Sequence, residues 1–523
     1  MKPTSECTAW TRLQERARTL MRDDSDALSL DSSRLDWMSG SLGRVWIDFS
    51  RQAVDDSTLA RLVDLAREAR LGQRIRSQFR GDHVNLSEDR AALHMACRGA
   101  WPEMPDAVRC QARASQERML DVVEAVRDGK LRGSNGKPFR HVVNLGIGGS
   151  HLGPALVVDA LGDQTLDVRF LVERNAHLVR QTLQSLDLAA TLFVVNSKSF
   201  RTEETLENAK VCRQILQEHV GRNSVAQHFW AVTTNADAAR TFGIAESKLL
   251  AMPDWVGGRF SVWSAFGITA AMALGTAGFK KFLEGGSLVD EHLLCTDLER
   301  NIPVLMALFA LWNCSFLICA THAVRTYEPR LSMFVPFLQQ LEMESNGKTA
   351  LQSGGRTEVA TGQIVWGGAE TAGQHSFHQL LHQGSSAVSV DIVSVLNRPE
   401  VSREEQVWGL SQMLANASLL FHGHTDSSRP MFEQVAGGRS ASLVLLEELD
   451  PTALGTLIAL YEHKVACLGF LWGTNPFDQW GVEHGKTLAK RYRASLQEGV
   501  APADVAPLDA ATVRAIIQRA SRR

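Results

Sequence analysis

The fold follows from ten residues, His141-Val142-Val143-Asn144-Leu145 followed by Gly146-Ile147-Gly148-Gly149-Ser150. The first five predict a buried strand, and the next five predict a tight turn into a helix. Glycines at such a turn let backbone N–H groups approach an anion at the helix N-terminus. A dinucleotide fingerprint would place a third glycine at position 151, where this chain has His151, so that class of site is disfavoured. A structural turn without a ligand is the alternative.

The pattern around this turn alternates between strand-like and helix-like segments. Alternation of this kind is typical of parallel sheets covered by helices. We therefore expect two α/β units, at 111–286 and 287–523, preceded by a helical N-terminal region at 1–110. The second unit ends in a helical tail after residue 500. The predicted strands are 141–145, 168–172, 192–195, 229–233, 363–366, 388–395 and 442–446, and the main predicted helices are 57–71, 115–128, 202–220, 403–420 and 452–471.

Composition narrows the class of protein. The chain has 523 residues, a net charge of −3 and 44% hydrophobic residues, as ordinary soluble proteins do, and it lacks the basic field of a nucleic-acid-binding protein. None of its eight cysteines forms a CxxC pair, and the N-terminus has no apolar signal region, so we expect a cytoplasmic protein. The apolar stretch 302–320 reaches membrane-spanning length, but we interpret it, like 260–279, as a buried core or interface helix.

A second candidate anion site is Ser197-Lys198-Ser199-Phe200-Arg201-Thr202, which also follows a strand and precedes a helix. The helix dipole and free N–H groups favour anions there, and lysine is a good point-charge partner for phosphate. A helix-capping cluster is the alternative. We favour phosphate binding, because capping does not require a lysine between hydroxyls.

Two further stretches carry candidate catalytic groups. Gly257-Gly258-Arg259 places an arginine before an apolar segment, where it could stabilise developing negative charge or form only an ion pair. Glu342 and Glu344 precede a Ser-Asn-Gly turn. They would share one face of an extended segment but diverge in a helix, and either is a candidate base.

Histidines gather at His375, His378 and His382. The last two are one helical turn apart and could bind a metal, but they lack a nearby acid in sequence, so we expect no metal site. His375 would face a cleft at the start of its segment. Near the C-terminus, Lys486 is a candidate cleft cation or a surface charge.

Together these stretches resemble the phosphoglucose isomerase (glucose-6-phosphate isomerase) family. The resemblance covers about residues 45–490 and keeps the order of the family's motifs. The segments that carry it are 85–94, 146–154, 257–261, 343–348, 373–384 and 477–486.

The resemblance implies two αβα sandwich units of the sugar-isomerase type and conversion of glucose 6-phosphate to fructose 6-phosphate through an enediolate. It implies that Glu344 moves the proton, that Arg259 stabilises the enediolate, and that His375 and Lys486 open the ring. It further implies a homodimer in which the partner subunit supplies His375, and no metal, cofactor, nucleic acid or membrane. The substrate-binding residues that it implies are Gly149, Ser150, Ser197, Lys198, Ser199, Thr202, Gly258, Gln340 and Gln479.

Three positions depart from the family pattern. His151 stands where the family usually has aspartate, and Ser199 and Arg201 stand where threonines are common. Ser199 keeps a hydroxyl, so we expect phosphate binding to survive. Two alternatives are another sugar-phosphate isomerase of similar architecture and a non-catalytic sugar-phosphate-binding regulator. The intact Glu344 argues against the regulator, because binding alone needs no base.

Overall fold

The computed structural model describes residues 4–20, 31–426, 428–502 and 504–520, and one of its two sheets contains the strand His141–Leu145. Five parallel strands lie in the order β4-β3-β5-β6-β7. Every residue of β5 and β6 is buried, as expected for a parallel sheet covered on both faces. Their bounds are β3 His141–Leu145, β4 Asp167–Leu171, β5 Thr191–Asn196, β6 Phe229–Thr233 and β7 Leu249–Ala251.

Helices connect and cover these strands. Apolar residues of the strands pack against apolar faces of α8, α9 and α10 in one core. The predicted α/β alternation is therefore confirmed in this half. The bounds are α6 Asp106–Arg127, α7 Leu152–Leu161, α8 Ala176–Gln184, α9 Glu203–Val220 and α10 Ala236–Phe242.

The second sheet has six strands in the order β1-β2-β11-β10-β8-β9. The four strands β8 to β11 are parallel to one another, whereas β2 is antiparallel to both of its neighbours. The bounds are β1 Ser39–Leu42, β2 Val45–Asp48, β8 Thr321–Thr326, β9 Ile364–Ala369, β10 Val388–Val395 and β11 Ala441–Leu446, with helices α13 Phe334–Leu338, α14 Glu370–Gln374, α15 His378–Gln383 and α16 Arg403–His422.

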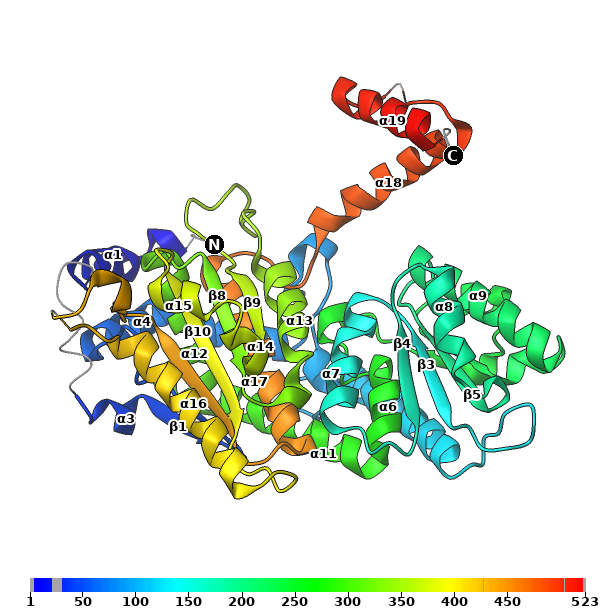
Figure 1. Ribbon diagram of the computed structural model, residues 1–523, viewed down its shortest axis with the longest axis horizontal. Helices are drawn as coiled ribbons and strands as arrows, with labels where there is room; N and C mark the ends of the chain where they lie inside the picture. Colours follow the sequence, from blue (N-terminus) through cyan, green and yellow to red (C-terminus); the bar gives the residue numbers. More distant parts are fainter. Residues whose placement is uncertain (1–3, 21–30, 427, 503, 521–523) are drawn as a thin grey trace. The chain divides into compact units, whose positions relative to one another are not determined.

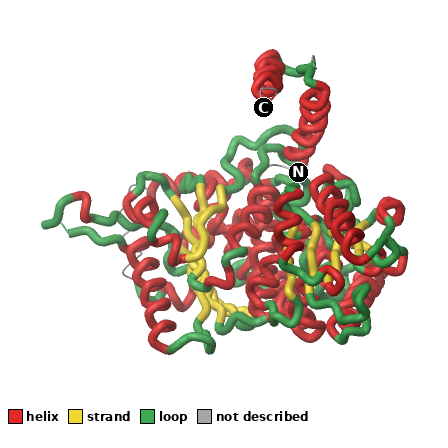
Figure 2. Tube along the Cα trace, turned by 45° about the vertical axis from the view of Figure 1, so that its right-hand side comes forward, coloured by secondary structure: helices red, strands yellow, loops and turns green. Residues whose placement is uncertain are grey.

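A closely packed helix pair lies between the two sheets. It consists of α11 (Ile268–Cys295) and α17 (Pro451–Trp472), and Figures 1 and 2 show the strands in two groups on either side of the helical layer. A Cβ on Gly285 would lie 2.0 Å from the Thr452 carbonyl oxygen, and one on Gly455 would lie 2.0 Å from that of Phe282. Glycine at both positions therefore permits the backbones to touch.

The N-terminal region contains more than the predicted helices. Its helices are α1 Thr8–Leu20, α3 Arg34–Trp37, α4 Asp56–Glu68 and α5 Leu71–Phe79. The hairpin β1–β2 lies between them and pairs with β11, so this region contributes two strands to the second sheet. The predicted helical region therefore also contains a β-hairpin.

The predicted boundary between the two α/β units lies within a helix. Position 286/287 falls inside α11. Contacts within the chain divide it into two compact units, Met1–Pro476 and Phe477–Arg523. The second of these units contains α18 (Trp480–Glu498) and α19 (Pro507–Ala520), with an ion pair between Arg491 and Asp504 at 3.1 Å.

The apolar segments are core helices. All residues of α12 (Ile302–Leu311) are buried, which confirms the prediction of a buried helix, although a π-helical turn at Trp312–Phe316 ends it before residue 320. The other stretch, 260–279, is helical only from Ile268 and is interrupted at Gly275 (φ 71°). In the described part of the chain, α17 alone is long and apolar enough to cross a membrane, and all of it is buried.

Candidate active site

Two glycine turns meet backbone to backbone at the ends of the first sheet. A Cβ on Gly149, in the turn after β3, would lie 1.9 Å from the carbonyl oxygen of Gly258. The Ser261 hydroxyl donates to that same oxygen at 2.5 Å and to the Gly149 carbonyl at 3.3 Å. The contact requires glycine at position 149 and brings Arg259 beside the first turn.

The turn after β3 adjoins the predicted phosphate loop, residues 197–202, because β3 and β5 are neighbours. The Asn196 side chain donates to Asn144 at 2.5 Å, and Asn144 donates to the Ser150 carbonyl at 3.1 Å. The strand order reverses between β3 and β5, and open parallel sheets bind ligands outside the carboxyl ends of their strands at such a point. Both loops therefore lie where this fold places ligands.

The loop 197–202 has an unusual backbone. Phe200 has φ 49°, and its buried ring packs on Phe242 with centroids 5.9 Å apart. A left-handed conformation at a bulky residue is strained and is found most often at functional sites. Thr202 precedes α9 but makes no side-chain cap, and its hydroxyl lies 3.0 Å from that of Ser197. The capping alternative therefore loses its main support.

Lys198 joins this loop to the segment that leads to Arg259. Its ammonium donates to the carbonyls of Asp254 (2.8 Å) and Val256 (3.1 Å) and lies 3.3 Å from the Asp254 carboxylate. Burial lowers the pKa of Lys198, and Asp254 opposes that shift. The lysine is thus a partly desolvated cation beside the exposed Ser199.

Glu342 and Glu344 point to different partners. They belong to a π-helical turn, Gln339–Glu344, so the helical alternative holds. Glu342 is buried and accepts from the Lys464 ammonium at 2.7 Å. The Glu344 side chain is 25% exposed, and its Oε2 accepts from Gln340 at 3.2 Å and from Arg259 at 3.3 Å. Glu344 is therefore the carboxylate that a ligand can reach.

Arg259 is held rigidly beside Glu344. It is 4% exposed, and its guanidinium donates to the Ser345 hydroxyl and the Pro476 carbonyl, both at 2.6 Å. Gln340 lies against the first glycine turn, since a Cβ on Gly148 would be 2.9 Å from its Nε2. A carboxylate, a fixed guanidinium and an amide thus converge on the two glycine turns. Such a set can exchange a proton and stabilise a developing oxyanion.

Three further predicted residues lie on other segments of the chain. His375 follows α14 and is exposed. Gln479 and Lys486 belong to the unit Phe477–Arg523, where Lys486 is exposed and pairs with Glu483 at 2.6 Å.

The other two histidines of the cluster have partners within the chain. His378 contacts Arg325 at 2.8 Å and the Glu370 carboxylate, an acidic neighbour that the spacing of the sequence does not reveal. His382 lies 3.3 Å from the Asn416 side chain. Among the described residues no group of three His, Cys, Asp or Glu side chains could hold a metal ion.

Sequence reasoning missed several residues that organise the site. Ser261 and Ser345 lie within the segments 257–261 and 343–348, but no role was predicted for them. Nothing in the neighbouring sequence distinguishes them from other serines. Lys464 could have been found from the sequence, because Glu462, His463 and Lys464 are consecutive ionisable residues in an otherwise apolar helix.

Comparisons with known proteins give matches along most of the chain. The family model described as phosphoglucose isomerase matches residues 48–514. The glucose-6-phosphate isomerase of Aromatoleum aromaticum is 42% identical over 518 residues, covering 95% of each chain. Glucose-6-phosphate isomerase 1 of Chromohalobacter salexigens is 40% identical over 489 residues, covering 91% of this chain and 89% of the relative.

Solved structures show the same architecture. A glucose-6-phosphate isomerase from Chlamydia trachomatis superposes with a TM-score of 0.87 at 29% identity, covering 98% of this chain and 99% of that one. A hypothetical protein from Thermus thermophilus superposes with a TM-score of 0.63 at 25% identity, covering 86% of this chain and 100% of that one.

Proposed function

This chain belongs to the phosphoglucose isomerase family, and from that membership we propose that it interconverts glucose 6-phosphate and fructose 6-phosphate. The reaction is an aldose–ketose isomerisation that serves glycolysis and gluconeogenesis. The observation that carries the proposal is the 3.3 Å contact between the Arg259 guanidinium and the Glu344 carboxylate at the edge of the two glycine turns.

Glu344 acts as the base in this proposal. Its carboxylate takes the proton from C2 of the open-chain aldose, and the C–H electron pair forms the C1–C2 double bond of an enediolate. Arg259, whose charge is permanent, stabilises the oxyanion that develops on the former carbonyl oxygen. Glu344 then returns the proton to C1, and the proton of the C2 hydroxyl passes to the O1 oxyanion as the ketose carbonyl forms at C2.

The phosphate anchors the substrate at a distance from the reacting carbons. The hydroxyls of Ser197, Ser199 and Thr202, with the Lys198 ammonium, bind it at the carboxyl end of β5. Anchoring of this kind converts remote binding energy into correct placement of C1 and C2 over Glu344. The groups that line the sugar are Gly149, Ser150, Gly258, Gln340 and Gln479.

Ring opening is assigned to His375 and Lys486. The exposure of His375 supports a site completed by a second copy of the chain, with this histidine reaching the partner subunit's Glu344. The protein then works as a cytoplasmic homodimer. The steps above use only side-chain acids, bases and cations, without a metal or organic cofactor.

A coupled assay that follows glucose 6-phosphate formation from fructose 6-phosphate tests the proposal. Glu344→Gln keeps the shape but removes the base, so kcat should fall about a hundredfold or more with little change in KM. In tritiated water, wild type should place label at C2 of the aldose, and the variant should not. Glu218→Gln, on an exposed face of α9, is the matched control. Retention of most of the kcat by Glu344→Gln would refute this assignment.

A further inference from the structure

The buried helix α17 carries three consecutive ionisable residues, Glu462, His463 and Lys464, which are 0%, 0% and 2% exposed. Consecutive residues of an α-helix point about 100° apart, so the three side chains leave α17 in different directions. Buried charges cost stability unless each is paired. Each of these residues has a partner, and two of the partners flank the proposed catalytic groups.

Lys464 holds the turn that carries Glu344. Its ammonium donates to Glu342 at 2.7 Å, two residues before Glu344. Two residues after Glu344, the Asn346 side chain donates to the Val465 carbonyl of α17 at 3.0 Å. The turn is therefore fixed on both sides of Glu344, which sets the direction in which that carboxylate points.

Glu462 holds the segment that carries Arg259. Its carboxylate accepts from the indole N–H of Trp263 at 2.8 and 2.9 Å, four residues after Arg259. Phe260, next to Arg259, stacks on His94 with centroids 4.6 Å apart, and His94 Nε2 lies 3.8 Å from Glu462. Two buried aromatic side chains near Arg259, Trp263 and Phe260, thus connect its segment to Glu462 of α17.

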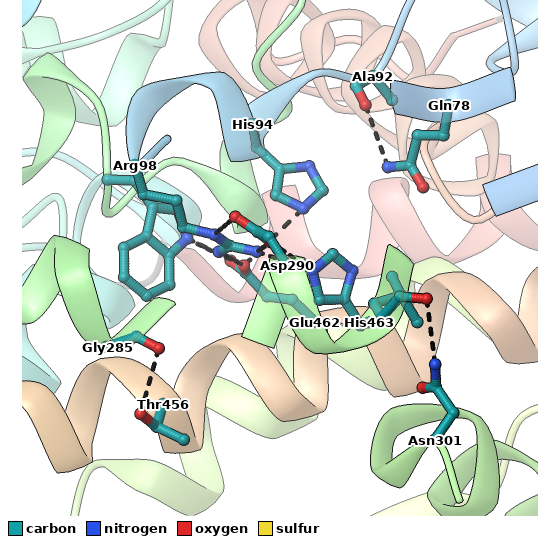
Figure 3. A network of polar contacts seen from close by, with 12 residues as sticks. Gln78, Ala92, His94, Arg98, Gly285, Asp290, Asn301, Thr456, Glu462 and His463 are labelled. Atoms are coloured by element: carbon teal, nitrogen blue, oxygen red, sulfur yellow. Dashed lines mark hydrogen bonds and ion pairs between the residues drawn. The ribbon is translucent and has the colours of Figure 1, made fainter. Parts of the chain in front are cut away.

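The Glu462 carboxylate is itself held in place. Arg98 donates to it at 2.5 Å and makes two hydrogen bonds to Asp290 of α11, at 2.7 and 2.9 Å. His463 Nε2 lies 2.6 Å from the same aspartate. Figure 3 shows Arg98, Asp290, Glu462, His463 and His94 converging on one another. This network fixes Glu462 against the helix pair.

We propose that Glu462 and Lys464 are positioning residues, which set the separation of Arg259 and Glu344 from a single buried helix. The inference rests on the proposed function, because it concerns how the proposed base and oxyanion stabiliser are kept in register. Arg259 and Glu344 lie 85 residues apart in sequence but within 3.3 Å in space. A displacement of about 1 Å at such a pair can cost on the order of a hundredfold in rate.

Paired substitutions separate positioning from packing. Glu342→Leu/Lys464→Met replaces the ion pair by apolar groups, which buried sites often tolerate without loss of stability. Its melting temperature should stay near that of wild type, but kcat should fall at least about tenfold with KM within about twofold. Glu342→Gln/Lys464→Gln retains a hydrogen bond between side chains of similar length and should recover kcat to within about threefold of wild type.

A second variant tests the Arg259 side. Trp263→Phe keeps an aromatic ring but removes the donor to Glu462, so kcat should fall while KM changes little. The control is Tyr461→Phe, which removes the buried hydrogen bond to Asp391 (2.7 Å) on the same helix but keeps the ring that lies 5.0 Å from the Lys464 ammonium. It should lower the melting temperature and leave kcat unchanged.

The outcomes are distinct. Wild type measured in the same assay tests the proposed function by itself, since an inactive wild type refutes that function and not the positioning. If wild type is active, two results would overturn the inference. One is a Leu/Met double variant that keeps the kcat of wild type. The other is a loss of kcat in Tyr461→Phe as large as that in the Leu/Met double variant. Loss of kcat in the Leu/Met double variant and Trp263→Phe, with recovery in the Gln/Gln variant, supports it.

Discussion

Lys198 links two loops of the site through one ammonium group. The carbonyls of Asp254 and Val256 accept from it, so it holds the phosphate loop against the segment leading to Arg259. Lys198→Ala should raise KM for fructose 6-phosphate about tenfold or more, because a charge-assisted hydrogen bond to phosphate is lost. Lys248→Ala removes a half-buried lysine that donates to the Ala226 carbonyl instead, and it should leave KM unchanged. If Lys198→Ala and Lys248→Ala have equal KM values, Lys198 does not bind the phosphate.

Glu342 and Glu344 show where sequence reasoning ends at the scale of one residue. Both are carboxylates beside the same turn, and chemistry alone did not choose between them. The choice depends on a π-helical turn and on Lys464, which lies more than a hundred residues further along the chain. Neutralising Glu342 would leave that lysine buried and unpaired, so Glu342 is unsuitable as an inert control.

The contact between the two glycine turns is an element-scale constraint. Gly149→Ala would push a methyl group into the Gly258 carbonyl, 1.9 Å away, so the turns must separate. We expect kcat to fall at least about tenfold, because the segment carrying Arg259 moves with the second turn. Gly409→Ala, on α16, meets no atom within 4 Å and should leave kcat unchanged. Normal activity in Gly149→Ala would show that the contact is dispensable.

The network on α17 should give the folded state a measurable pH dependence. Burial raises the pKa of Glu462 from 4.5 to about 7, while Arg98 and the Trp263 indole oppose the shift. The folded protein therefore keeps a proton that the unfolded chain releases, and stability from this group falls as pH rises from about 4.5 to 7, by about 3 kcal/mol in all.

Glu462→Gln should remove that slope. Urea unfolding at several pH values between 4.5 and 8 measures it, as the difference in unfolding free energy between wild type and variant. His94 and Asp290 face the same carboxylate, and His463 pairs with Asp290. All three titrate in both proteins, so their contributions largely cancel in the difference. Parallel stability curves for the two proteins would contradict the prediction.

The secondary structure could be predicted where a strand is an unbroken run of buried apolar residues. Strands β3, β6 and β10 begin and end where the apolar runs predicted them. Strand β8 was not predicted, for two reasons. It begins directly after the apolar stretch 302–320, and His322 and Arg325 interrupt its run of apolar residues. Their partners Asp391 and Glu370 lie on later segments, which no local window contains.

For the whole molecule, we predict that activity requires two subunits. His375 is exposed at the surface of the single chain, where a second subunit can reach it. The apolar segment 302–320 gives no support for an interface, because α12 is buried within its own chain. His375→Ala and Glu344→Gln proteins, each inactive alone, should recover about a quarter of wild-type activity when their subunits exchange, since half of the dimers then hold one intact site. The control is each variant treated alone, and no recovery despite demonstrated exchange would place both residues in one chain's site.

The pairing of β2 with β11 has a consequence for how the protein is made. On the ribosome, Asp48 emerges 395 residues before Leu443, its neighbour in β11, which at roughly 5–20 residues per second is a delay of about 20–80 s. During that interval the hairpin β1–β2 has a free edge, of the kind that pairs with other chains. Nascent chains of this protein are therefore expected to depend on chaperone protection until residue 446 has been synthesised.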